Sequence, residues 1–455
     1  MSEHIDPIEE QYKLLHQRLK NEQLQEFRNE LLDLHLYEQG LFYVSLDEEE
    51  RQQIYTYLSP KEMGDIFDVL EEETEEMPEY LEEMRPQYVS DMLSEMYTDN
   101  AVDILKQLDK TEIAKYLSLM NHEDVKEIKA LLHYEDETAG AIMTTEYVSI
   151  VANQTIRSAM YLLKTEALVA ETIYYVFVVD DFNHLVGVIS LRDLIVHDED
   201  ELIFDVMNER VISVKVGDEQ SDVARMIKDY DFLAIPVTDY DDHLLGIVTV
   251  DDIIDVIDEE ATSDYSGLAG VDVDEASEHP IKAASKRLPW LITLLFLGMS
   301  TATLIGQYEA LVSEASVLAV FISLITGTAG NAGTQSLAVA VRRLAVQNEK
   351  GNNFFRMILS ELLTGLVTGA ITGLTIFIIV GIWKHNFMLG FVIGMAMLCA
   401  ITVANLAGSL IPMLMDKLGF DPAVASGPFI TTLSDLTSVL IYFNIASLFM
   451  RYFIS

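Results

Sequence analysis

The chain has 455 residues, half of them hydrophobic, and its 74 acidic and 29 basic side chains leave a net charge of −45. So large an excess of negative charge argues against nucleic acid or anionic lipid as the main partner, because both require a basic surface. A single cysteine, Cys399, excludes an internal disulfide and a cluster of cysteine metal ligands.

The charge is divided unevenly between the two parts of the chain. Residues 276–455 hold 10 basic and 8 acidic side chains, a net of +2, whereas residues 1–275 hold 19 basic and 66 acidic, a net of −47. A compact part with so many like charges repels itself unless cations bind to it. The sequence therefore predicts an acidic, cation-binding part followed by an apolar one.

Residues 1–137 show the pattern of short amphipathic helices. Residues typical of helix starts recur at Ser59-Pro60, Thr98-Asp99, Asp109 and Asn121. We expect an all-α superhelical domain with an acidic surface. Its predicted core includes Val102, Leu105, Ile113, Leu117, Val125 and Ile128.

Residues 138–256 contain an internal repeat of short strands and helices, in which Met143 matches Met207 and Gly187 matches Gly246. Helical periodicity is expected at residues 157–163 and 222–229. The repeat resembles a tandem α/β CBS domain, a pair of βαββα modules that commonly binds adenine nucleotides or metal ions as a regulator. Each copy carries the motif G-h-h-[ST]-x-x-D, which ends at Asp193 and at Asp252. Either these groups hold a ribose and phosphate, or the two aspartates only cap the helices that follow.

Residues 257–284 begin as an acidic helix and become loose around Gly267 and Gly270. The segment is either a solvated linker or a mechanical coupler to the apolar part.

Residues 285–455 are predicted to be an all-α transmembrane domain with five helices. Five apolar stretches in a row are each long enough to cross a bilayer, which disfavours buried helices of a large soluble protein. Eight of the ten basic residues of the segment 276–455 lie on one side if the acidic part is cytoplasmic, so we expect the N-terminus inside and the C-terminus outside. The stretches are Leu288–Tyr308, Ala315–Val341, Met357–Trp383, Phe387–Leu414 and Pro428–Phe453.

Asp435 is the most informative residue, because a carboxylate inside the last apolar stretch is costly unless it faces a water-filled path or a basic partner. No Lys or Arg lies inside the other four stretches, and the other interior acid, Glu361, is near Arg356. Thr431 shares a helix face with Asp435, and such oxygen ligands suit a hard cation such as Mg²⁺. The small polar segment at residues 327–335 either packs closely or lines a pore.

The whole chain resembles the MgtE family of Mg²⁺ channels and transporters. Its order of domains matches, and the most specific strings begin at Asp252, Gly330, Ala404, Asp421 and Thr432. The resemblance implies a homodimer in the bacterial cytoplasmic membrane. It implies a Mg²⁺-selective channel that is closed when cytoplasmic Mg²⁺ binds the acidic surfaces, and a protein that is not an enzyme.

The resemblance also implies site residues. Asp435 and Thr431 would hold hydrated Mg²⁺ in the pore, with Asp421 at its cytoplasmic mouth. Asn331, Asn405 and Gly427 would line the pore, and nucleotide contacts would fall near Tyr175, Arg192, Asp193 and Phe232. Gly427 stands where well-studied members carry an amide, and Ser263 replaces an acid of the connecting helix. The regulatory metal positions would be Glu62, Asp99, Asp103, the backbone at Gly140, Glu219, Asp231, Asp252, Asp255, Glu260 and Asp264.

Other readings stay open at this point. The protein could transport other divalent cations such as Co²⁺ or Ni²⁺, or it could be a membrane-anchored nucleotide sensor that carries no ion. A CBS-regulated anion channel would require basic groups in the membrane, where the sequence has Asp435.

Overall fold

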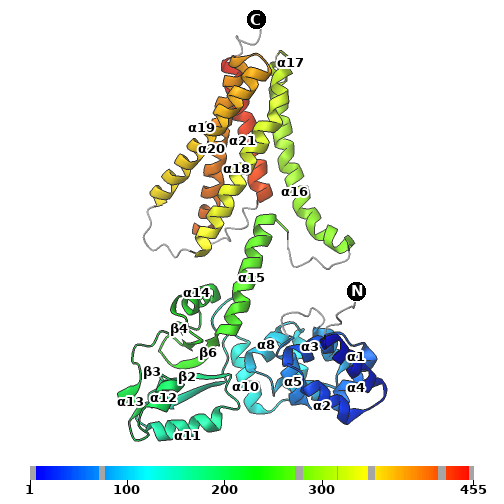
Figure 1. The fold of residues 1–455 in the computed structure, drawn as a ribbon, viewed down its shortest axis with the longest axis vertical. Coiled ribbons are helices and arrows are strands. Elements are labelled where there is room, and N and C mark those ends of the chain that lie inside the picture. The colour runs from blue at the N-terminus through cyan, green and yellow to red at the C-terminus, as the bar shows by residue number, and fades with distance from the viewer. Residues whose placement is uncertain are drawn as a thin grey trace. The chain divides into compact units, whose positions relative to one another are not determined.

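The computed structural model describes residues 7–70, 77–271, 280–314, 316–346, 354–418 and 427–449. The chain folds into two compact units, Met1–Ile257 and Asp258–Ser455 (Figure 1). The first unit joins a helical part to an α/β part, and the second is helical throughout its described residues.

The helical part of the first unit is a succession of short helices, as predicted. The side chains of Ser59, Asp109 and Asn121 cap α5, α9 and α10. The prediction of a cap at Thr98 is wrong: the N-cap of α8 is Tyr97, and Thr98 Oγ1 instead donates to Glu146 Oε1 at 2.6 Å. The helices are α1 (Pro7–Lys20), α2 (Leu24–Leu32), α3 (Leu36–Val44), α4 (Glu48–Tyr57), α5 (Pro60–Phe67), α6 (Met77–Glu83), α7 (Pro86–Leu93), α8 (Thr98–Lys106), α9 (Lys110–Leu117) and α10 (His122–Leu131).

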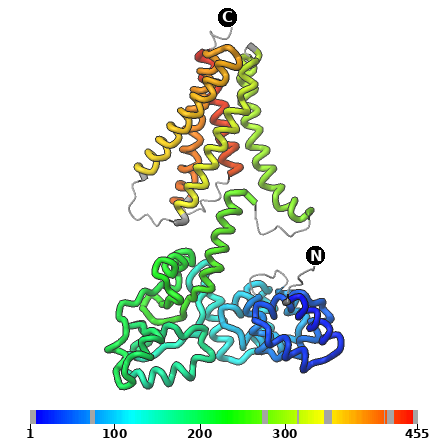
Figure 2. Tube along the Cα trace, in the orientation of Figure 1, coloured from blue at the N-terminus to red at the C-terminus, as the bar shows by residue number. Residues whose placement is uncertain are grey.

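One hydrophobic core runs through the helical part and into the α/β part. The six predicted core residues all belong to it, four of them buried and Ile113 and Val125 partly buried. The same cluster includes Ile235, Val248 and Ile253 of the α/β part. Figure 2 shows the α/β trace beside the last of the short helices. The shared core fixes the two parts of this unit against each other.

The α/β part consists of two three-stranded sheets with the same topology, which confirms the predicted repeat. In each sheet the first strand pairs parallel to the second, and the second pairs antiparallel to the third. The elements of the first copy are β1 (Tyr147–Val151), α11 (Ile156–Glu166), β2 (Thr172–Val179), β3 (Leu185–Ser190), α12 (Leu191–Val196) and α13 (Ile203–Val206). Those of the second are β4 (Val214–Lys215), α14 (Gln220–Tyr230), β5 (Ala234–Thr238) and β6 (Leu244–Thr249).

Each copy is completed by a methionine from the segment that precedes the other. A Cβ on Gly187 would lie 2.4 Å from Met207 Sδ, and one on Gly246 would lie 3.0 Å from Met143 Sδ. A Cβ on Gly246 would also lie 2.6 Å from the backbone carbonyl oxygen of Thr144, so glycine permits this close approach. The repeated methionines and glycines thus mark reciprocal contacts between the copies.

Helix α15 (Val250–Ala269) continues directly from β6 and extends past the boundary between the units at Ile257. The segment around Gly267, predicted to be loose, belongs to this helix, which ends before Gly270 with its φ of 68°. The coupling segment is therefore helical for most of its length.

Among its described residues, the second unit contains five helices long and apolar enough to span a membrane, as predicted from the sequence. Helices α18 and α20 approach so closely that a Cβ on Gly408 would lie 2.2 Å from the carbonyl oxygen of Gly333. Small residues at such crossings are typical of membrane helix packing. The described elements are α16 (Pro280–Gln307), α17 (Glu309–Glu314), η2 (Ser316–Leu318), α18 (Ala319–Val346), α19 (Phe354–Trp383), α20 (Phe387–Lys417) and α21 (Gly427–Leu448).

Candidate functional site

An acidic cavity of about 720 Å³ lies between the helical part and the two CBS copies, inside the first unit. The start of α15 and the turn before α8 form two of its walls. Its described lining contains a single basic side chain, that of Lys61, so its charge is strongly negative. The carboxyl side chains are Asp65, Asp68, Glu95, Asp99, Glu146, Glu171, Asp251, Asp252 and Asp255.

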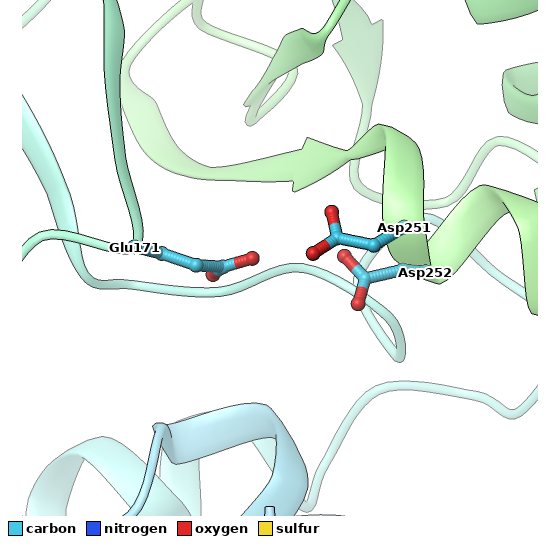
Figure 3. Close-up of side chains that lie close together, drawn as sticks. All are labelled: Glu171, Asp251 and Asp252. Carbon is cyan, nitrogen blue, oxygen red and sulfur yellow. The ribbon is translucent and has the colours of Figure 1, made fainter. Parts of the chain in front are cut away.

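Three of these carboxylates meet at the first turn of α15. One oxygen each of Glu171, Asp251 and Asp252 lies within 4.8 Å of the others, and Figure 3 shows Glu171 pointing toward the two aspartates. Among the described residues, Glu171 Oε2 is buried without a hydrogen-bond partner. A buried, unpartnered carboxylate oxygen that faces two further carboxylates favours a proton or a cation between them.

The local structure at β6 and α15 fixes how Asp252 enters this cluster. Its Oδ2 accepts hydrogen bonds from Thr249 Oγ1 at 2.5 Å and from the Thr249 backbone N–H at 3.2 Å. One oxygen therefore caps the helix, and the second remains for the cavity. The helix-cap alternative predicted for Asp252 is thus observed, and it leaves one carboxylate oxygen available to a cation in the cavity.

Several carboxyl groups of the cavity have pKa values above their ordinary ones. Burial and the charge of Asp252 raise the pKa of Glu171 to about 7, and burial with the charges of Asp251 and Asp255 raises the pKa of Asp252 to about 6. Burial, followed by the charge of Asp252, raises the pKa of Asp99 well above its usual value. Glu171 and Asp252 therefore take up protons near neutral pH, and a bound divalent cation would stabilise their charged forms instead.

The structure brings together three of the predicted metal residues, Asp99, Asp252 and Asp255, around this cavity. Sequence reasoning missed Glu171 and Asp251, which lie in the tightest cluster. Asp251 was detectable as the neighbour of Asp252 at a helix start. Glu171 carries no local motif, because it precedes β2 and reaches the site only through the tertiary fold.

Two further predicted metal residues lie outside the lining of this cavity and have protein partners. Glu62 forms a capping box with Ser59 and an ion pair with Arg28. Although burial opposes them, these hydrogen bonds leave its pKa below the ordinary value. Asp103 lies 3.2 Å from Lys106 Nζ. A cation at either position would compete with a basic side chain.

The remaining predicted regulatory positions lie around α14 and along α15. The backbone N–H of Gly140 donates to the Val216 carbonyl at 2.9 Å, and the adjoining chain forms a bridge between Thr138 and Glu219. Gly140 and Glu219 are therefore on neighbouring segments. Asp231 ends α14 in the left-handed conformation, with φ 54°, whereas Glu260 and Asp264 follow one another on α15.

A second cavity, of about 580 Å³, contains two of the predicted nucleotide contacts. Tyr175 and Arg192 line it together with Ser190. Asp193 does not line it and accepts a hydrogen bond from Ser190 Oγ at 2.6 Å. The N-cap of α12 is Ser190 and not Asp193, because Ser190 Oγ accepts the Asp193 backbone N–H at 3.2 Å. Phe232 also lies outside its lining and stacks on Tyr230, although the adjacent Leu233 is part of the wall.

In the second unit, Asp435 is half-buried on α21 and forms no ion pair with any described residue. Thr431 Oγ1 donates to the Gly427 carbonyl at 2.9 Å. A Cβ on Gly330 of α18 would lie 3.0 Å from Thr431 Cγ2, so this segment packs closely on α21. The neighbouring Asn331 side chain is exposed on the single chain. Asp421 lies outside the described residues.

Asn405, predicted to line the pore, is buried inside the helix bundle. Its Nδ2 donates to the backbone carbonyl and to Oε2 of Glu361, both at 3.1 Å. Glu361 in turn pairs with Arg343 at 2.9 Å and not with the neighbouring Arg356. Positions 356 and 361 are five residues apart and do not share a helix face, whereas Arg343 belongs to the adjacent helix α18. The polar groups of α18, α19 and α20 therefore satisfy one another.

Comparison with known proteins agrees with this architecture. Family profiles match a divalent cation transporter domain at residues 322–445, an MgtE intracellular N domain at 34–137, and CBS domains at 139–200 and 203–259. The chain is 78% identical to "Magnesium transporter MgtE" of Enterococcus faecalis, over 98% of this chain and 99% of that protein. It is 36% identical to the Bacillus subtilis protein of the same name, over 95% and 96% of the two chains.

Two solved structures resemble the first unit. "Crystal structure of the soluble part of a magnesium transporter" has 72% identity and a TM-score of 0.55, over 56% of this chain and 99% of that chain. "Crystal structure of the cytosolic domain of the Mg2+ channel MgtE in complex with ATP" has 34% identity and a TM-score of 0.50, over 53% and 98%.

The near full-length identity, the matched domains and the five apolar helices confirm the resemblance drawn from the sequence. Membership of a transporter family also confirms the prediction that the protein is not an enzyme. The chain belongs to the MgtE family.

Proposed function

We propose that this protein transports Mg²⁺ across the bacterial cytoplasmic membrane, down its electrochemical gradient. The relatives named magnesium transporter, two of which match over nearly their full length, support this proposal. Asp435 also supports it, because this carboxylate lies in an apolar helix and has no basic partner among the described residues. Asp435 and Thr431 would hold the ion with much of its water in place, since Mg²⁺ dehydrates reluctantly. Asp421 would attract it at the cytoplasmic mouth.

The protein would be closed by the ion that it transports. At high cytoplasmic Mg²⁺, ions occupy the acidic cavity and hold the helical part, the CBS pair and α15 together. At low Mg²⁺, the uncompensated carboxylates repel one another and the arrangement loosens. Glu171, Asp251, Asp252, Asp255 and Asp99 would be the main ligands in the cavity. Glu62, Asp103, Gly140, Glu219, Asp231, Glu260 and Asp264 would be secondary positions.

The single observation that carries this regulation is the path of α15. Asp252 and Asp255, at its start, line the acidic cavity. Leu268, near its end, packs against a cluster formed by Leu337 of α18 and Ile430 of α21. Because α15 begins in the first unit and ends in the second, it would transmit cation binding in the cavity to the helices that carry the small polar segment and Asp435.

The working form would be a homodimer with the ion path between the two membrane domains, in which Asn331 and the region of Gly427 face the path. The exposed position of Asn331 and the half-buried position of Asp435 on a single chain support this assembly. The excess of basic residues on one side of the apolar helices supports a cytoplasmic N-terminus and an external C-terminus.

An adenine nucleotide is proposed as a second regulatory ligand, bound in the cavity that Tyr175, Ser190 and Arg192 line. An aromatic ring, a hydroxyl and a guanidinium suit a base, a ribose and a phosphate. The resemblance to a cytosolic domain described in complex with ATP supports this choice of ligand.

Flux through purified protein in liposomes tests the proposal. We expect Mg²⁺ influx in the absence of chloride flux, with closure when Mg²⁺ is supplied on the cytoplasmic side. Parallel measurements with Co²⁺ and Ni²⁺ define selectivity among divalent cations. Chloride flux would favour an anion channel, and no ion flux would favour a nucleotide sensor.

A further inference from the structure

A pair of histidines joins the two CBS copies at a place that neither the acidic cavity nor the nucleotide cavity uses. His184 and His243 occupy matching positions in the turns that lead into β3 and β6. They form an antiparallel bridge between the two turns, with Leu185 N–H donating to the Asp242 carbonyl and Leu244 N–H donating to the Asn183 carbonyl, both at 3.0 Å. Opposite residues in such a non-hydrogen-bonded pair project from the same face and lie close together.

The two imidazole rings face each other. Their centroids are 4.5 Å apart, with an angle of 24° between the ring planes. Both side chains are more than one-third exposed, at 38% and 37%, so solutes can reach them.

An aspartate four residues earlier orients each ring in the same way. His184 Nδ1 lies 2.9 Å from Asp180 Oδ2, and His243 Nδ1 lies 2.9 Å from Asp239 Oδ2. The second oxygen of each aspartate accepts two backbone N–H groups, which fixes the carboxylate in its turn. Because a carboxylate only accepts, Nδ1 carries the proton and Nε2 of a neutral ring is left with a free lone pair.

Two imidazoles with their Nε2 atoms free and their Nδ1–H groups held by carboxylates are the arrangement of histidine metal ligands. We propose that His184 and His243 bind a transition-metal ion such as Zn²⁺, Co²⁺ or Ni²⁺ across the two CBS copies. Imidazole nitrogen suits these borderline ions, whereas Mg²⁺ requires oxygen ligands. Two such nitrogens on a tetrahedral ion lie about 3.3 Å apart, and each bond to the ion lies in the plane of its ring. The two stacked rings would therefore turn out of their nearly parallel arrangement to converge on one ion, and their exposure leaves room for that rotation.

The surroundings favour a cation over an anion at this place. Lys215 is the basic side chain described next to the turns, and its Nζ is held by Asp242 Oδ1 at 2.6 Å and by the Asp239 carbonyl at 2.7 Å. Asp180 and Asp239 contribute negative charge directly behind the rings. Water molecules would complete the coordination, and the bound ion would fasten the first CBS copy to the second.

Metal titration of the full-length protein in detergent tests this site, with millimolar Mg²⁺ present to occupy the acidic cavity. We expect one Co²⁺ per chain with the visible spectrum of nitrogen ligation, displaced by Zn²⁺. His184→Ala and His243→Ala should each weaken binding about tenfold or more. The matched control is His197→Ala, because His197 is an exposed histidine of the same domain whose Nδ1 is also held by a carboxylate, Glu201, at 2.8 Å.

Equal Co²⁺ binding by the parent and by the His184→Ala/His243→Ala double variant would overturn the proposal. A second measurement does not depend on any variant. X-ray absorption at the zinc edge of the unaltered protein should show two imidazole ligands, and a shell of oxygen ligands alone would likewise overturn it.

Discussion

Protons should compete with Mg²⁺ for the acidic cavity. The pKa of Glu171 is raised to about 7 and that of Asp252 to about 6, and both carboxylates must be deprotonated to bind an ion. When the pH falls from 8 to 6, protonation of a carboxylate with a pKa of about 7 weakens the apparent affinity for Mg²⁺ about tenfold. Protonation of a carboxylate with a pKa of about 6 weakens it about twofold. Together they predict a roughly 20-fold loss of affinity, or about 1.8 kcal/mol.

The assay is protection of the full-length protein from proteolysis as a function of Mg²⁺ concentration, because a ligand that binds the compact form stabilises it. The midpoint should shift to higher Mg²⁺ by about 20-fold at pH 6. Glu171→Gln should weaken binding at pH 8 and flatten this pH dependence to about twofold, since one titrating ligand is lost. An Asp109→Asn variant is the matched control, because Asp109 caps α9 and does not line the cavity. A Mg²⁺ midpoint that does not change between pH 8 and pH 6 would refute the reasoning.

Three further outcomes are expected. Asp435→Ala should abolish Mg²⁺ uptake in a Mg²⁺-requiring strain while the protein remains folded, and normal uptake would contradict the pore assignment. Without Mg²⁺, the raised pKa values of Glu171 and Asp252 mean that the folded first unit binds more protons than the unfolded chain. Its thermal stability should therefore fall as pH rises from about 4 to about 7. A rise in stability over this range would show that folding does not destabilise the charged forms of these carboxylates. Glu361→Leu removes the carboxylate that pairs with Arg343 and one of the two hydrogen bonds of Asn405 Nδ2, and should lower the free energy of unfolding in detergent by about 2 kcal/mol. The loss is less than for a fully buried pair because Arg343 is half-exposed, and an unchanged thermal midpoint would contradict that role.

The sequence predicts the elements of this fold well, because the signals are local and periodic. Alternating strands and repeated glycines identified the two CBS copies, and runs of apolar residues identified all five membrane helices. Helix capping was predicted where the side chain meets only its own helix, as at Asp109. It failed at Thr98, since Glu146, distant in sequence, takes its hydroxyl.

The candidate site was predicted only in part, for the same reason. Asp252 and Asp255 lie on one helix face and carry a recognisable motif, whereas Glu171 reaches them through the packing of β2 and has no motif. Asn405 and Glu361 also show this limit, because the partner of each lies on another helix. Local patterns thus identify which residues are available, and tertiary contacts decide which of them act together.

The central claim is that cations in the acidic cavity close the pore through α15, and single-channel recording tests it directly. Open probability is measured against cytoplasmic Mg²⁺ for the parent and for Asp252→Asn combined with Asp255→Asn. We expect Mg²⁺ to close the parent and the double variant to stay open at the same concentrations, because a hard divalent ion depends on charged oxygens for binding. A closing curve that is unchanged in the variant, or shifted to lower Mg²⁺, would contradict the account.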